Sequence, residues 1–375
     1  MKVLYLHNVP IDSHFANLLQ VKSMCKAMAL QGMDVILSLP ANGLKYAHQK
    51  YTNDLYEIIL RNELINNKKI DKYINYNSVK KTIKNVNPDL IYIRSPILIK
   101  QAISSNRPIV VELHNYQLHQ GYSFINNYWK RFLRRKSKSD QFIKFICISN
   151  ALRDFWVEQG LPAEKIITAH DAIDEQQFPR PISISEARKR LGFSNEKKII
   201  TYLGRIYKNR RIDAIIELAA IYSNTLFLVV GGPDNEADYM RKISEKKELN
   251  NIMFTGQVPH NEITSYLYAS DVLLALWSSK VRTINYCSPL KLFEYMGAGR
   301  IIVAHGFPTI LEILEHNYNA IISEPDSIND LIEKVGYALE LNYPNSLAEN
   351  ARNDVFEHYT WTKRVDKIFY DISKS

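Results

Sequence analysis

The most constraining feature of this sequence is the regular alternation of short runs rich in Val and Ile with segments of helical length. In the first half of the chain the runs are residues 3–9, 33–39, 90–95, 108–114 and 145–149, and a helix is expected near residues 14–31. Runs that are apolar throughout are typical of parallel strands, whose two faces are both buried. The pattern therefore predicts an α/β domain in which helices cover a parallel sheet.

A second series of the same kind follows an interruption rich in Pro and Ser at residues 177–193. Its runs are residues 198–204, 225–232, 251–256, 271–277, 300–304 and 319–323. A chain of 375 residues also exceeds the usual size of one domain. We therefore expect two Rossmann-like domains, with a boundary near 180/181. Because open parallel sheets bind ligands beyond the carboxyl ends of their strands, two facing sheets predict a site in the cleft between them.

The composition of the chain limits the kinds of partner and the cell compartment that we expect. Lys and Arg number 48 against 39 Asp and Glu, a net charge of +9, which favours an anionic partner. The three cysteines are far apart and have no C-x-x-C spacing, which argues against disulfides and structural zinc and predicts a cytoplasmic protein. Without an apolar run of 18 residues or a signal-peptide core, any membrane association is expected to be peripheral.

Residues 288–304 predict a helix that glycine ends and a strand follows. Ser288 is expected to cap this helix, and Pro289 fits its first position. Gly297 or Gly299 can end it. The segment is therefore a helix with a defined start, and its free N–H groups and dipole attract anions.

Two residues of this helix, Lys291 and Glu294, lie opposite its apolar stripe at 100° per residue. They could form an exposed pair three residues apart, worth a few tenths of a kcal/mol. Alternatively, the helix start binds a phosphate while the Glu294 carboxylate accepts hydrogen bonds from vicinal sugar hydroxyls. A nucleotide would satisfy both features of the second interpretation.

A cationic turn follows the run at residues 198–204. Gly204 lets the chain leave the strand tightly, and the four cations that crowd the turn are Arg205, Lys208, Arg210 and Arg211. The turn is either a solvated basic loop or a diphosphate clamp. We favour the clamp because ligands bind at the carboxyl ends of such strands.

His114, at the end of the run at residues 108–114, is a candidate site residue in the first domain, although a lone His is more often a packed residue. His7 ends the first run in the same way. The pair His114 and His119 lacks ligand spacing, and no D-x-D follows a strand. We therefore expect no catalytic metal.

Residues 121–139 interleave aromatic side chains with six cations. In a helix, Phe124, Tyr128 and Phe132 would line one stripe beside a cationic face. The pattern suits an anionic membrane surface, or else a helix that covers the first sheet with its charges in water. Nucleic acid is disfavoured because no known binding module accompanies the charge.

Taken together, several segments of the chain resemble glycosyltransferase family 4, retaining enzymes of the GT-B fold. The resemblance runs through ICISNAL, KIITAHDAIDEQQF, ITYLGRIYKNRRID, LVVGGP, MFTGQVPHNEITSYLYASDVLLAL, SPLKLFEYMGAGRIIVA and ARNDVFEHYTWTKRVDKIFYDI. It implies an acceptor-side domain at residues 1–180 and a domain that binds the nucleotide sugar at 181–357. It also implies that residues 358–375 form a helix that crosses back to the first domain.

The resemblance also assigns roles to residues. Glu294 would hold the donor's ribose hydroxyls, and Arg205 with Arg210 would clamp its diphosphate, with Lys208 as an alternative cation. The other predicted donor contacts are Gly204, Tyr286, Ser288, Leu290 and Lys291, and Tyr286 occupies a place where the family often has a second glutamate. His114 would line the sugar pocket, and the glycine pair common after the first strand is missing.

The resemblance implies transfer of a hexose-type sugar, without a metal, from a UDP- or GDP-sugar to a glycan or lipid-linked acceptor. A bacterial polysaccharide pathway at the inner face of the membrane is the expected setting. Arg205, Arg210 and the helix start at Leu290 would stabilise charge on the departing diphosphate. Two other interpretations stay open: a nucleotide-sugar epimerase of the same architecture, and a non-catalytic partner subunit, for which Tyr286 is the argument.

Overall fold

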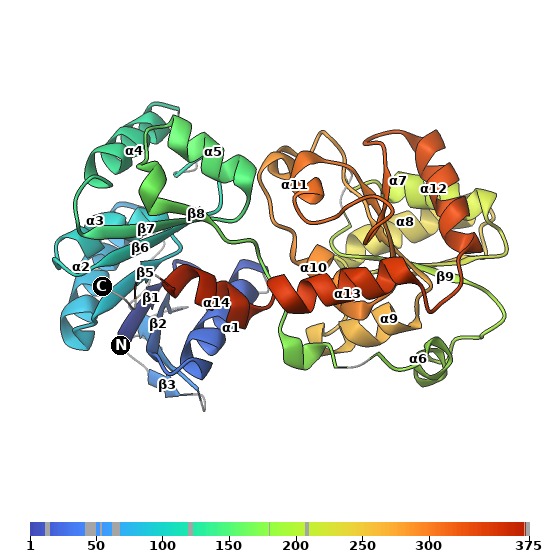
Figure 1. Ribbon diagram of the computed structural model, residues 1–375, viewed down its shortest axis with the longest axis horizontal. Coiled ribbons are helices and arrows are strands. Elements are labelled where there is room, and N and C mark those ends of the chain that lie inside the picture. The colour runs from blue at the N-terminus through green and yellow to red at the C-terminus, as the bar shows by residue number, and fades with distance from the viewer. Residues whose placement is uncertain are drawn as a thin grey trace. The chain divides into compact units, whose positions relative to one another are not determined.

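The computed structural model describes residues 1–11, 16–41, 50–52, 55–61, 68–118, 123–179, 181–206, 210–370 and 372. The chain divides into two compact units (Figure 1). Unit 1 comprises Met1–Asp171 with Trp361–Ser375, and unit 2 comprises Ala172–Thr360. Both are α/β, as predicted. The chain passes between the units at 171/172 and 360/361 rather than at 180/181 and 357/358, because Ile173 and Phe178 are buried in a core of unit 2.

Unit 1 is built on a sheet whose described strands have the order β3-β4-β2-β1-β5-β6-β7-β8. The strands are β1 (Lys2–Leu6), β2 (Asp34–Pro40), β3 (Lys50–Thr52), β4 (Glu57–Arg61), β5 (Leu90–Ile93), β6 (Ile109–Leu113), β7 (Phe142–Cys147) and β8 (Ile166–Thr168). All pairs are parallel except β3 with β4. The five runs predicted as strands all form strands, whereas β3, β4 and β8 were not predicted.

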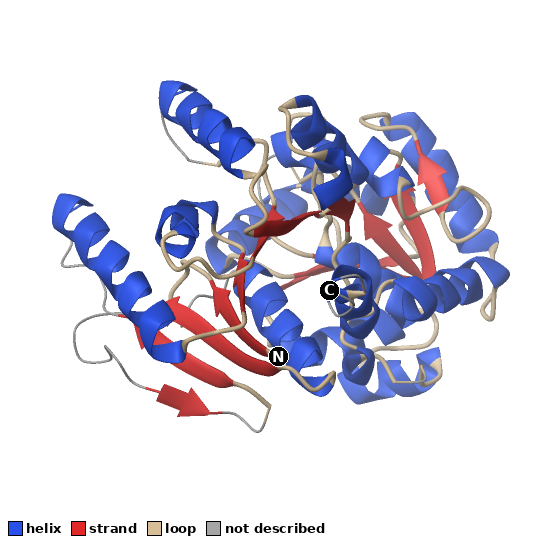
Figure 2. Cartoon of the chain, turned by 60° about the vertical axis from the view of Figure 1, so that its left-hand side comes forward, coloured by secondary structure: helices blue, strands red, loops and turns tan. Residues whose placement is uncertain are grey.

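Helices flank this sheet (Figure 2). They are α1 (Ala16–Leu30), α2 (Lys68–Val86), α3 (Ile99–Ile103), α4 (Ser123–Lys136), α5 (Asn150–Glu158) and α14 (Trp361–Phe369). The last helix packs beside the first: Gln31 donates from Nε2 to the Thr362 carbonyl at 2.9 Å and to Asp366 Oδ1 at 2.8 Å. The prediction that the C-terminal helix returns to the first domain is confirmed.

Unit 2 is built on a second sheet whose described strands are all parallel and have the order β11-β10-β9-β12-β13-β14. They are β9 (Ile199–Leu203), β10 (Leu226–Val230), β11 (Ile252–Gly256), β12 (Val272–Ala275), β13 (Ile301–His305) and β14 (Ile321–Ser323). Its helices are α6 (Ile184–Leu191), α7 (Ile212–Ile221), α8 (Asp234–Lys246), α9 (Ile263–Ala269), α10 (Leu290–Ala298), α11 (Pro308–Leu311), α12 (Ile328–Glu340) and α13 (Ser346–His358).

The two faces of this second sheet belong to two separate cores. Along β9, Ile199 and Leu203 lie in one buried cluster, and Ile200 and Tyr202 lie in the other. Successive side chains of a strand point to opposite faces, so an apolar strand feeds both layers of helices. The six predicted runs therefore form strands because side chains on both of their faces are apolar and buried.

Two glycines bring the ends of β9 and β10 into backbone contact. Gly204 and Gly231 have φ values of 139° and 132°, and a Cβ atom on Gly231 would lie 2.2 Å from the Gly204 carbonyl oxygen. Only a residue without a side chain allows this approach. The packing fixes the backbone at the end of β9, where the cationic turn begins.

We expect Gly231→Ala to lower the free energy of unfolding by about 2 kcal/mol or more, because its Cβ must displace backbone and its φ is strained. Gly32→Ala is the matched control. Its φ is 82°, but the new Cβ meets no atom within 4 Å, so about 1 kcal/mol of strain is expected. Urea unfolding of both variants measures the difference, and equal losses would contradict this account.

Candidate active site

The first part of the candidate site lies where β9 ends. The Gly204 N–H donates to the Val230 carbonyl at 2.9 Å, and a side chain on Gly204 would lie 3.8 Å from Lys291 Nζ. Arg205 follows directly and is exposed, whereas Arg210 is partly buried. Lys208 lies outside the described residues. The structure therefore brings together Gly204 and Lys291, two predicted donor contacts that belong to separate motifs of the sequence.

Arg211, the last cation of this turn, forms ion pairs within the protein. Its Nη1 lies 3.1 Å from Asp326 Oδ1, and its Nε lies 3.5 Å from Asp213 Oδ2. It also serves as the N-cap residue of α7, with a left-handed φ of 58°. Arg211 is thus a structural cation, which separates it from Arg205 and Arg210.

Helix α10 begins at Leu290, and the prediction that Ser288 caps it is wrong. Pro289 is the N-cap residue, and its side chain forms no capping hydrogen bond. Pro289 has an extended backbone, with φ −79° and ψ 119°. The first hydrogen bond of the helix therefore runs from the Leu292 N–H to the Pro289 carbonyl. At the other end Gly299 adopts φ 60° and stops the helix, while Gly297 lies within it. The N-cap residue therefore leaves the first N–H groups of α10 uncapped, as anion binding requires.

The Lys291 ammonium lies over two aromatic rings. Its Nζ is 4.2 Å from the centroid of Tyr202 and 4.4 Å from that of Trp277, which follows β12. Burial, and then the nearby charge of Arg210, hold the pKa of Lys291 well below its ordinary value. Two cations thus share a site that is largely withdrawn from water, which is unfavourable unless an anion joins them.

The Glu294 side chain is 13% exposed, and its partner is a residue that the sequence did not suggest. His260 Nε2 lies 3.2 Å from Glu294 Oε1, and this hydrogen bond raises the pKa of His260. His260 begins a short helical turn (His260–Glu262) that follows β11. Lys291 and Glu294 do not form the exposed pair that was one interpretation, because each contacts other side chains.

Helix α10 is held against the strands by the Tyr295 hydroxyl. This hydroxyl accepts from the Leu203 N–H at 2.7 Å and donates to the Leu274 carbonyl at 3.2 Å. The bonds fix the helix start relative to the ends of β9 and β12. Tyr286, which precedes the helix, is 8% exposed, and its N–H donates to Thr283 at 3.1 Å. Its phenol cannot supply the negative charge of the glutamate that it replaces.

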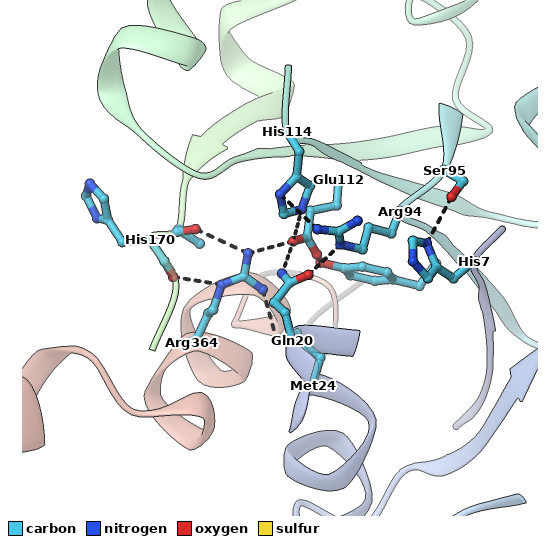
Figure 3. A network of polar contacts seen from close by, with 11 residues as sticks. His7, Gln20, Met24, Arg94, Ser95, Glu112, His114, His170 and Arg364 are labelled. Atoms are coloured by element: carbon cyan, nitrogen blue, oxygen red, sulfur yellow. Dashed lines mark hydrogen bonds and ion pairs between the residues drawn. The ribbon is translucent and has the colours of Figure 1, made fainter. Parts of the chain in front are cut away.

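In unit 1, His114 directly follows β6 and belongs to a polar network (Figure 3). Its Nε2 lies 2.7 Å from Glu112 Oε1, and its Nδ1 lies 3.3 Å from Arg94 Nη2. Burial and the Arg94 charge lower the pKa of His114 to about 4. The ring is therefore neutral at pH 7, with its hydrogen on Nε2 and both nitrogens hydrogen bonded.

Glu112, Arg94 and Arg364 are site residues that the sequence analysis missed. Glu112 is the single charged residue of an otherwise apolar strand, and this was the available signal. His7, by contrast, was noted. Its Nδ1 lies 2.9 Å from Ser95 Oγ, and burial first, with Arg94, lowers its pKa to about 2.

Helix α4 carries the basic and aromatic stretch. It buries Asn126, Trp129 and Leu133, whereas Phe124 and Tyr128 are 68% and 53% exposed. The aromatic stripe therefore faces away from the sheet. A pocket of about 440 Å³ lies on this surface, lined by Tyr128, Arg131, Phe132, Arg134, Arg135 and Lys138. Among the described residues no carboxylate lines it.

The described residues contain no group of three or more His, Cys, Asp or Glu side chains placed to hold a metal ion. None of the helices in this part of the chain is long and apolar enough to cross a membrane.

Comparison with known proteins identifies the family. Residues 20–177 match the model of Glycosyltransferase Family 4, and residues 183–354 match that of Glycosyl transferases group 1. Among solved structures, HepE of Anabaena in complex with UDP and glucose superposes over 100% of both chains with a TM-score of 0.76 at 17% identity. WaaG, a glycosyltransferase involved in lipopolysaccharide biosynthesis, covers 99% of both chains with a TM-score of 0.70 at 14% identity.

Curated relatives match over part of their length. The lipopolysaccharide 1,2-N-acetylglucosaminetransferase of Salmonella typhimurium is 26% identical over 59% of this chain and 60% of its own. The alpha-monoglucosyldiacylglycerol synthase of Streptococcus pneumoniae is 23% identical over 60% of this chain and 51% of its own. The match thus spans between half and three fifths of these relatives. With both family models matched and the fold shared, the chain belongs to glycosyltransferase family 4, of the GT-B type.

Proposed function

We propose that the protein is a retaining glycosyltransferase that moves a hexose-type sugar from a nucleoside diphosphate sugar to a glycan or lipid-linked acceptor without a metal ion. The observation that carries this proposal is the pair of cations Lys291 and Arg210 beside the uncapped start of α10. No ion pair joins either cation to a carboxylate in the part of the chain that the structure describes. A diphosphate would supply the missing negative charge.

Glu294 lies one helical turn beyond Leu290 and would recognise the ribose. His260 contacts Oε1, and among the described residues no hydrogen bond to Oε2 is present, so we propose that Oε2 accepts from a sugar hydroxyl. A hydrogen bond between a charged and a neutral group contributes about 1.5–3 kcal/mol, enough to select a nucleotide over free diphosphate. Gly204, Tyr286, Ser288 and Lys291 are the further residues that we propose for the donor.

The chemistry follows from the charge that develops as the donor breaks. The bond between the anomeric carbon and the phosphate oxygen lengthens, so the sugar gains positive charge and the diphosphate gains negative charge. Arg205, Arg210 and the N–H groups at the start of α10 would stabilise the leaving group, a task that a metal ion performs elsewhere. His114 stays a predicted sugar contact. Its pKa of about 4 and its occupied nitrogens argue against a general base.

The nucleotide and the acceptor are proposed from relatives. HepE was solved with UDP and glucose, which supports a UDP-sugar, with a GDP-sugar as the alternative. The names of the Salmonella and Streptococcus relatives support a lipid-linked or glycan acceptor in polysaccharide or glycolipid synthesis. The cations of α4 support peripheral association with an anionic membrane surface on its cytoplasmic face, and not with nucleic acid.

A melting-temperature screen against UDP-, GDP-, ADP- and CMP-sugars tests the function. We expect one nucleotide to stabilise the protein by about 2.7 kcal/mol at 100 times its Kd, with or without a chelator. Transfer assays with the same donor should also be insensitive to the chelator. Conversion of the donor without acceptor would indicate an epimerase, no stabilisation by any donor would indicate a non-catalytic subunit, and loss on chelation would contradict metal independence.

We expect Arg205→Gln or Arg210→Gln to slow turnover by about 10²-fold or more, because each removes a preorganised donor to the leaving group. Initial-rate kinetics at saturating donor measure the effect. Arg190→Gln is the matched control, since that exposed guanidinium pairs only with Glu186. Undiminished turnover in a folded variant would end the role of that cation.

A second readout of the Arg210 variant is proton uptake. An anion favours the charged form of Lys291 and raises its lowered pKa, so binding of UDP takes up protons, and its affinity falls as pH rises above that pKa. Arg210→Gln removes one cause of the low pKa and should reduce the uptake. Titration calorimetry in buffers of different ionisation enthalpy measures it, and unchanged uptake would contradict the assignment.

The membrane proposal predicts the behaviour of a triple variant, Arg131→Gln with Arg135→Gln and Lys138→Gln. At about 1 kcal/mol per cation, its binding to vesicles that contain anionic lipid should fall roughly 10²-fold. The control removes the same charge from exposed lysines of unit 2, with Lys242, Lys246 and Lys247 changed to Gln. Equal sedimentation of both variants with the vesicles would place the contact elsewhere.

A further inference from the structure

Glu112 is a fully buried carboxylate whose two oxygens are both engaged. Oε1 accepts from Gln20 Nε2 at 2.5 Å, from His114 Nε2 at 2.7 Å and from Arg364 Nη2 at 3.0 Å. Oε2 accepts from the Tyr92 hydroxyl. The partners come from α1, β5, the end of β6 and α14, so segments distant in sequence converge on one side chain (Figure 3).

The guanidinium of Arg364 offsets the cost of burying the Glu112 carboxylate. Arg364 is 3% exposed, and its other N–H groups donate to the His170 carbonyl at 2.8 Å and the Ala169 carbonyl at 3.2 Å. Burial alone raises the pKa of Glu112, but Arg364 first, followed by His114, outweighs it and leaves the pKa well below its ordinary value. Glu112 is therefore an ionised acceptor at neutral pH.

The hydrogen bonds around His114 form a closed cycle of four side chains. His114 and Gln20 both donate to Glu112, while Arg94 donates from Nη2 to His114 Nδ1 and from Nε to Gln20 Oε1. Because Glu112 can only accept and Arg94 can only donate, one arrangement of hydrogens satisfies every member. That arrangement puts the imidazole hydrogen on Nε2.

We propose that Glu112 is a positioning residue for sugar transfer: paired with Arg364 of the C-terminal helix, it accepts the Nε2 hydrogen of His114 and so fixes that ring in one tautomer and one orientation at the carboxyl end of β6. The role in sugar transfer rests on the proposed function, whereas the tautomer of His114 does not depend on it. The proposal gives α14 a part in the site, because residues after 360 supply the counter-charge.

The first test uses wild-type protein labelled with ¹⁵N-histidine, with the His114 signals assigned by their loss in His114→Gln. The two ring nitrogens of a neutral imidazole give distinct ¹⁵N shifts according to which carries hydrogen. We expect hydrogen on Nε2 and none on Nδ1 throughout pH 6–8. The opposite tautomer, or a mixture, would overturn the proposal without any variant.

The second test removes the acceptor without stranding a charge. A single change at Glu112 leaves Arg364 buried and unpaired and so risks unfolding. The double variant Glu112→Leu with Arg364→Met avoids this problem. We expect it to lose the fixed tautomer and to slow kcat about 10- to 100-fold, as loss of a supporting partner does at other sites, with KM for the donor within about twofold.

Glu112→Gln with Arg364→Met is the matched rescue, because its amide oxygen still accepts from Nε2 although no charge is present. We expect it to restore the tautomer and most of kcat. Asp271→Asn is the stability control: it breaks another buried pair, Arg188–Asp271 in unit 2, and should leave the His114 signals unchanged. Normal kcat and unchanged His114 signals in the Leu/Met variant would overturn the proposal. Absence of transfer from every donor by wild-type protein would instead overturn the proposed function.

Discussion

The parallel pairing of β9 with β10 and β12 is the constraint on which the rest of the candidate site depends. Because Thr201 is in register with Leu228 and Leu273, the three strands run in the same direction and end at the same edge. The residues that closely follow these strands therefore lie at that edge: Gly204 and Arg205 after β9, and Trp277 after β12. The two hydrogen bonds of the Tyr295 hydroxyl then tie helix α10 to the ends of β9 and β12. The chemistry is thus set by topology first and by side chains second.

The two units treat buried charge in opposite ways. In unit 1 the negative charge of Glu112 is paired with Arg364 and accepts hydrogen bonds from Gln20 and His114. In unit 2 burial first, and then the charge of Arg210, lower the pKa of Lys291. An unpaired buried charge is costly, whereas a paired one is near break-even. The first arrangement therefore holds the His114 ring in place, whereas the second is the one that we propose for the diphosphate of the donor.

Local patterns in the sequence were sufficient for eleven of the strands and for the position of α10, because each depends on hydrophobic periodicity or on a helix stop signal. The failures have two physical causes. The Ser288 cap failed because the extended backbone of Pro289 itself takes the N-cap position. The partners of the key side chains were missed because they are distant: His260 lies 34 residues from Glu294, and Arg364 lies 252 residues from Glu112. Spacing within one helix or strand carries no information about such pairs.

Arg364 also lies beside the two places where the chain passes between units. In unit 2 the Ile173 N–H donates to the Tyr359 carbonyl at 2.9 Å, so the two passing segments are bonded to each other there. In unit 1 Arg364 bonds the carbonyls of Ala169 and His170, immediately before the first passage, and it belongs to the helix that begins after the second. The same guanidinium therefore holds both segments and neutralises Glu112.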